Sequence, residues 1–129
     1  KMRAERSGEI AVVASVAGYR GLPNASAYGP TKAALINLCE SLHTELTGSD
    51  VLLRVINPGF VKTRLTDKND FAMPYLLTPE QAADYLYRGL CGNNDFEIAF
   101  PPPFVRQLKL TRILPYPLFF KLMRKLVRA

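Results

Sequence analysis

Short apolar segments rich in β-branched residues alternate along this chain with longer segments of helical periodicity. The strand-like segments cover residues 9–14, 51–57 and 95–100, each bounded by a glycine or a proline. The helical segments cover residues 26–46 and 79–91. Alternation of this kind predicts strands that lie parallel in one sheet and are joined by right-handed helical crossovers. We therefore expect an α/β fold with three parallel strands.

The two expected helices carry recognisable signals at their ends. Ser26 is a candidate N-cap of the first helix, and Pro30 would fall in its first turn, where a missing N–H does no harm. Gly48 is expected to end that helix. Thr78 and Pro79 have the residue types of an N-cap and a first helical position, so the second helix should begin there.

Three segments are expected to meet at one edge of the sheet. Ser15 follows the first strand directly, Tyr28 lies at the entry of the next helix, and residues 58–63 follow the second strand. Ligands of open parallel sheets bind at the carboxyl ends of the strands. These segments therefore form the candidate site.

The residue types in these segments suit proton transfer. Tyr28 and Lys32 are four positions apart, so they share one face of a helix. A nearby ammonium favours the phenolate form of a tyrosine, which makes the tyrosine a usable general acid for carbonyl reduction or a base for alcohol oxidation. The hydroxyl of Ser15 could hold the substrate oxygen while charge develops on it.

The same segments resemble three successive signatures of the short-chain dehydrogenase/reductase family. They read Ala14-Ser15-Val16-Ala17-Gly18, Tyr28-Gly29-Pro30-Thr31-Lys32 and Asn57-Pro58-Gly59-Phe60-Val61-Lys62-Thr63. Tyr28 follows Ser15 by 13 positions, the interval usual in that family. The resemblance covers about residues 5–100. It implies the carboxyl-terminal, catalytic half of a Rossmann-like doubly wound parallel sheet.

By this resemblance the protein is an oxidoreductase that transfers a hydride between NAD or NADP and a small carbonyl or alcohol substrate. The resemblance assigns catalysis to Ser15, Tyr28 and Lys32, and it implies a homo-oligomer when the protein is full length. It also implies that Tyr28 and Lys32 contact the cofactor, together with Pro58, Gly59, Val61 and Thr63. The loop of residues 60–77 should line the substrate pocket. Its Phe71, Met73 and Tyr75 suggest an apolar substrate.

The glycine-rich turn that holds the dinucleotide in this family, Gly-x3-Gly-x-Gly, does not occur among the 129 residues. The acidic or basic position that separates NAD from NADP in this family is also missing, so the choice between NAD and NADP is not readable here. We expect the chain to be a fragment of a longer enzyme and to be inactive alone. The alternative is a non-catalytic fragment that serves as an interaction module.

The last 26 residues form a second unit, so we divide the chain into a catalytic half at 1–103 and a helical tail at 104–129. The tail holds seven basic residues and no acid. Its second helical stretch places Phe119, Leu122, Met123 and Leu126 on one face, as in helices that lie on anionic membranes. Peripheral membrane contact is therefore an alternative function. The tail could instead cover the substrate cleft or contact a partner subunit.

Composition narrows the remaining classes. Residues 1–103 carry ten basic and eleven acidic side chains, so the positive charge is local to the tail and a nucleic-acid binder is not expected. Cys39, Cys91 and His43 provide too few ligands for a zinc site, and the cysteines suit reduced thiols in a cytoplasmic protein.

Overall fold

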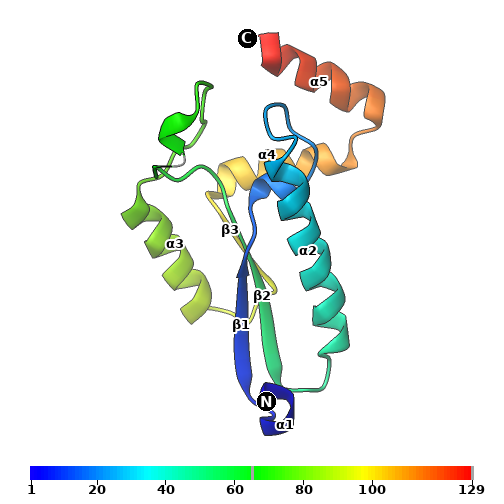
Figure 1. Cartoon of the computed structure of the whole chain (residues 1–129), viewed down its shortest axis with the longest axis vertical. Helices are drawn as coiled ribbons and strands as arrows, with labels where there is room; N and C mark the ends of the chain where they lie inside the picture. Colours follow the sequence, from blue (N-terminus) through cyan, green and yellow to red (C-terminus); the bar gives the residue numbers. More distant parts are fainter. Residues whose placement is uncertain (65, 129) are drawn as a thin grey trace.

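The computed structural model describes residues 1–64 and 66–128 (Figure 1). Three strands form one parallel sheet in the order β1-β2-β3, which confirms the expected α/β fold. The elements in chain order are α1 (Met2–Glu5), β1 (Gly8–Val13), the 3-10 helix η1 (Val16–Gly18), α2 (Tyr28–Glu45), β2 (Val51–Pro58), the 3-10 helix η2 (Thr66–Lys68), α3 (Pro79–Cys91), β3 (Glu97–Phe100), α4 (Pro102–Ile113) and α5 (Tyr116–Arg128).

The strand register brings the carboxyl ends of the strands together. β1 pairs with β2 from Gly8↔Val51 to Val13↔Ile56, and β3 pairs with the end of β2, up to Pro58↔Phe100. The short strand β3 therefore lies beside the carboxyl-terminal half of β2. Segments that leave all three strands begin at the same edge of the sheet.

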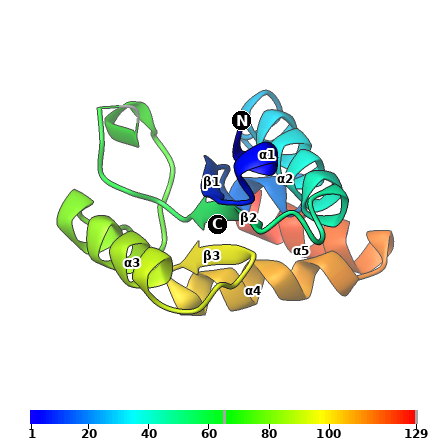
Figure 2. The ribbon, with the colours of Figure 1, turned by 90° about the horizontal axis from the view of Figure 1, so that it is seen from below.

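Helices cover both faces of the sheet (Figure 2). On one face, a core of buried side chains joins the sheet to α2 and α4 and includes Ile36, Leu53, Val55, Phe104 and Leu108. On the other face, Ile56, Ile98 and Phe100 pack against apolar residues of α3. None of the described helices is both long and apolar enough to cross a membrane.

The helix N-caps predicted from the sequence were only partly right. Thr78 caps α3 as predicted, and it forms a reciprocal capping box with Gln81. Ser26 is not the cap of α2, because Ala27 occupies that position without a side-chain cap. The reason is a backbone turn just before the helix, in which Gly29 N–H donates to the Ala25 carbonyl at 2.7 Å. The Ala25 carbonyl thus accepts from a backbone N–H of the first turn, the kind of donor that the hydroxyl of a serine N-cap would otherwise bind.

Prolines lie in the first turns of both helices of the tail. α4 begins at Pro102, so Pro102 and Pro103 fall in its first turn, where their missing N–H groups do no harm. The two predicted helical stretches are present, but Pro117 lies inside the first turn of α5. The third strand begins at Glu97, two residues later than predicted.

Candidate functional site

Ser15 connects the carboxyl ends of two strands. It follows β1, is 7% exposed, and its Oγ donates to the Pro58 carbonyl at 3.3 Å. The same Oγ accepts from Ala17 N–H at 3.2 Å and so caps η1. The hydroxyl is held in one orientation because both contacts are to backbone atoms. A second lone pair of Oγ remains for a bound group.

Tyr28 and Lys32 lie on one face of α2, as the sequence spacing predicted. The Lys32 Nζ lies 5.5 Å from the centroid of the Tyr28 ring. It also donates to the carbonyl of Val13, the last residue of β1, at 3.2 Å. The Tyr28 side chain is exposed, so its hydroxyl is accessible. Lys32 thus ties the first turns of α2 to the end of β1 and places a positive charge beside an accessible phenol.

Two glycines bring the Ser15 segment against the start of α2. A Cβ on Gly18 would lie 2.7 Å from the Lys32 carbonyl carbon, and one on Gly29 would lie 3.2 Å from the Ala17 carbonyl oxygen. Only residues without a side chain allow this approach without a shift of the backbone. The close packing places the Ser15–Gly18 segment beside the turns that carry Tyr28 and Lys32.

The segment after β2 begins at the same edge. Gly59 N–H donates to the Phe100 carbonyl at 2.7 Å, which ties the end of β2 to the end of β3. The loop then closes on itself, since Val61 forms a bridge with Leu77 and Thr66 binds both Val61 and Thr63. Pro58 is in direct contact with Ser15, because its carbonyl accepts from Ser15 Oγ. The contacts of Val61 and Thr63 lie within their own loop.

Sequence reasoning missed a polar cluster in the core beneath this edge. Glu97 accepts from Asn57 Nδ2 at 2.7 Å, from the Tyr19 hydroxyl and from the Lys109 ammonium. Burial opposes the charged form of Glu97, but the three donors outweigh it and lower the pKa of Glu97. Burial, followed by the hydrogen bond to Glu97, raises the pKa of Tyr19. The available signal was one acid between apolar neighbours in β3.

Arg20 holds the tail against the segment that joins Ser15 to Tyr28. Its Nη1 donates to the Leu114 carbonyl at 2.8 Å and also to the Thr111 carbonyl, at the carboxyl end of α4. Its guanidinium carbon lies 4.1 Å from the centroid of the Phe119 ring and 5.2 Å from that of Tyr116. A cation at this position complements the negative end of α4 and stacks on the aromatic rings of α5.

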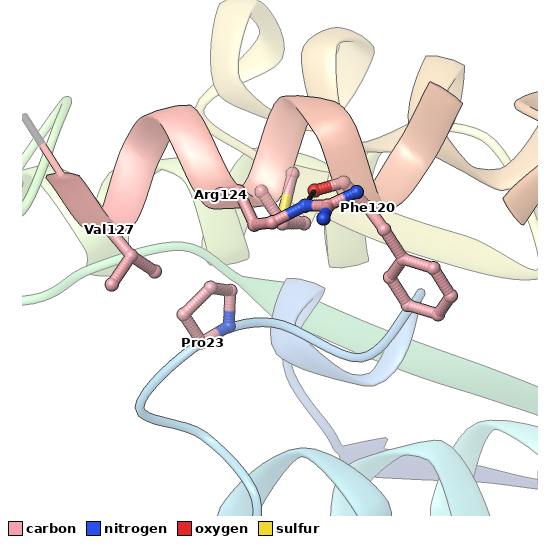
Figure 3. A pocket seen from close by; sticks show the side chains of 5 residues that line it. Pro23, Phe120, Arg124 and Val127 are labelled. Atoms are coloured by element: carbon pink, nitrogen blue, oxygen red, sulfur yellow. Dashed lines mark hydrogen bonds between the residues drawn. The ribbon is translucent and has the colours of Figure 1, made fainter. Parts of the chain in front are cut away.

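A groove of about 570 Å³ lies between the same segment and α5 (Figure 3). Pro23 forms one wall, and Phe120, Met123, Arg124 and Val127 form the other. Among the described residues of the lining, Arg124 is the charged one. The groove shows that α5 rests on the Ser15-to-Tyr28 segment along part of its length only.

Comparisons with known proteins agree with this architecture. A sequence model of the family described as short chain dehydrogenase matches residues 1–73. An uncharacterized oxidoreductase of Myxococcus xanthus is 36% identical over 126 residues, which are 98% of this chain and 49% of that protein. A 3-oxoacyl-(acyl-carrier-protein) reductase of Rickettsia felis is 35% identical over 68 residues, which are 53% of this chain and 28% of that protein.

A solved structure shows the same fold. The short chain dehydrogenase of Burkholderia cenocepacia, in complex with NADP, superimposes with a TM-score of 0.76 at 18% identity, over 95% of this chain and 49% of that one. The chain thus spans about half the length of these proteins, or less. The match over residues 1–73 covers more than half of the chain and includes the Ser15, Tyr28 and Pro58 segments. The chain therefore belongs to the short-chain dehydrogenase family.

Proposed function

We propose that this chain supplies the catalytic half of an oxidoreductase that transfers a hydride between NAD or NADP and a carbonyl or alcohol substrate. The observation that carries the proposal is an exposed Tyr28, whose ring centroid is 5.5 Å from the Lys32 ammonium, on the helix start that packs against the Ser15–Gly18 segment. Family membership supports the reaction class, and the NADP bound to the Burkholderia protein supports the cofactor class.

The three side chains have separate roles in this proposal. The Tyr28 hydroxyl gives its proton to the substrate oxygen during reduction and takes it back during oxidation. The Lys32 ammonium stabilises the negative charge left on the phenol oxygen. The Ser15 hydroxyl, held near the strand ends by two backbone contacts, orients the substrate oxygen, and it stabilises charge on that oxygen when its proton turns from the Pro58 carbonyl to the substrate.

The chemistry of the donor set fits the nicotinamide end of a dinucleotide. Lys32 uses one of its three N–H donors on the Val13 carbonyl, which leaves two for hydroxyl groups of a bound nucleotide. Tyr28, Pro58, Gly59, Val61 and Thr63 would form the rest of this end of the site. When bound, the nicotinamide supplies or accepts the hydride, and the chain supplies orientation and electrostatics.

An apolar wall suits a small substrate with apolar character. Phe60 packs against Phe104 and Phe71, with ring centroids 5.6 and 6.1 Å apart, and Tyr75 also packs against Phe104, at 6.0 Å. These rings join the loop after β2 to α4. Location in the cytoplasm and self-association of a full-length protein remain predictions.

Activity of a protein of the relatives' length tests the proposal. Such a protein, with this chain as its carboxyl-terminal half, should oxidise NADH or NADPH in the presence of some member of a ketone panel. Lys32→Ala should lower turnover because the phenol oxygen loses its charged neighbour, whereas Lys121→Ala at an exposed position of α5 is the matched control. Equal turnover in the two variants would contradict the role of Lys32. Failure to reduce any ketone of the panel would contradict the reaction class.

A further inference from the structure

Helix α5 carries an exposed stripe of three leucines. Leu118, Leu122 and Leu126 follow one another at four-residue intervals, and 55%, 39% and 62% of their surfaces are exposed. Lys121 and Lys125 lie at the intervening helical positions and are also exposed. Residues three or four positions apart are neighbours on a helix, so leucines and lysines form one continuous strip. We call these five residues the leucine–lysine strip.

The strip is not the surface that holds α5 to the body of the protein. Phe119 and Met123 provide that contact, and both are buried. The sequence suggested that Phe119, Leu122, Met123 and Leu126 act as one apolar face, but the structure divides them into a buried pair and an exposed pair. The apolar arc of α5 is wider than the surface that the body covers. Figure 1 shows α5 at the outer end of the molecule, with the carboxyl terminus.

The charged residues of the tail all have one sign. Residues 104–129 contain seven basic residues and no acid. Within the described part of the chain, Lys121 and Lys125 form no ion pair, while Lys109 of α4 binds Glu97. Whatever covers the leucines must therefore accept apolar side chains and neutralise adjacent positive charge.

We propose that the leucine–lysine strip docks on the surface of an anionic membrane. The leucines would enter the boundary between headgroups and acyl chains, and the lysines would extend to lipid phosphates. A lipid surface suits the strip better than a shaped protein partner does, because the recessed groove of α5 lies elsewhere, at Pro23, Phe120 and Val127. This docking is independent of the proposed oxidoreductase activity.

Sedimentation of the 129-residue chain with vesicles tests the proposal. Vesicles of phosphatidylcholine with phosphatidylserine should bind the chain, pure phosphatidylcholine should bind it much less, and salt should weaken the binding. Lys121→Glu with Lys125→Glu should weaken binding about tenfold or more, because each change replaces a positive charge near the anionic surface with a negative one. Leu118→Ser with Leu122→Ser and Leu126→Ser should abolish it.

The matched control replaces exposed apolar residues outside the strip. Leu110→Ser with Ile113→Ser changes α4 side chains that are 63% and 78% exposed, and it should leave vesicle binding unchanged. Circular dichroism should show that all variants keep their helices, since every substituted residue is exposed or half-exposed. Binding to neutral and anionic vesicles alike, or no binding, would overturn the proposal. Self-association that the leucine variant removes would assign the strip to a second copy of the chain and would equally overturn it.

Discussion

Glu97 shows how one side chain connects elements that are far apart in the sequence. It joins β3 to β2 through Asn57, to α4 through Lys109, and to the segment after η1 through Tyr19. A half-buried carboxylate loses part of its hydration, and here three donors compensate for that loss. The cluster therefore contributes more to stability when Glu97 is ionised.

The pKa of Glu97 in the folded chain is lower than its ordinary value, so the stabilisation is present at neutral pH and is lost as pH falls through the folded pKa. The free energy of unfolding, measured by urea titration, should accordingly decrease from neutral pH into the acid range. Glu97→Gln should cost about 1–3 kcal/mol at neutral pH and should remove part of that pH dependence. Glu45→Gln, at an exposed position of α2, is the control. If Glu97→Gln kept the full pH dependence, Glu97 would not be its source.

The sequence predicted the residues whose contacts are local and missed those that are not. Tyr28 and Lys32 meet because helical spacing brings them together. The segment that begins at Ser15 directly follows a strand and packs against the start of α2. Glu97 and Arg20 were missed because their hydrogen-bond partners are 12 to 94 positions away and depend on the tertiary fold. No periodicity or capping pattern encodes contacts of that range.

At the scale of elements, boundaries were predictable where a side chain sets them. α3 begins at Thr78-Pro79 and spans the predicted residues 79–91, because its capping box is formed by residues close together in the sequence. α2 begins two residues after Ser26 because a backbone turn replaces the side-chain cap. Such a turn depends on the path of the loop, which local propensity does not specify.

Arg20 is the residue that we expect to fix α5 in place. Arg20→Ala should remove both hydrogen bonds to the end of α4 and the stacking on α5, so amide hydrogen exchange in α5 should become faster while that in α3 stays the same. Arg20→Lys should restore little of the protection of α5 from exchange. Lysine lacks the planar guanidinium, which can donate hydrogen bonds to carbonyls and stack on an aromatic ring at the same time. Arg88→Ala, which breaks an exposed ion pair on α3, is the control. Unchanged exchange in α5 after Arg20→Ala would mean that Phe119 and Met123 suffice to hold the helix.

At the scale of the molecule, β1 pairs only with β2 among the described strands, and its Val13 side chain is exposed. The carboxyl edge holds the predicted catalytic residues, and the predicted pyrophosphate-binding turn has no counterpart in the 129 residues. The division of the chain at residue 103 also remains a prediction. We infer that these residues carry the nicotinamide end of the site and depend on a further segment for the rest of the dinucleotide.

Calorimetric titration of the 129-residue chain tests that inference. Binding of NADH and NADPH should be weak, because helix termini and backbone N–H groups at a glycine-rich turn hold the pyrophosphate in such folds. Turnover of ketones should also be absent, since orientation of the nicotinamide depends on anchoring the whole cofactor. Micromolar binding would show that the chain suffices without that turn.

The most direct test of the central claim concerns the proton of Tyr28. Tyr28→Phe keeps the ring and its place beside Lys32 but removes the hydroxyl, and Tyr87→Phe makes the same change at an exposed position of α3. In a protein of the relatives' length, ketone reduction by NADH or NADPH should fall about 100-fold or more in Tyr28→Phe and stay unchanged in Tyr87→Phe. Turnover of Tyr28→Phe within about twofold of the parent protein would contradict the assignment of Tyr28 as the proton donor.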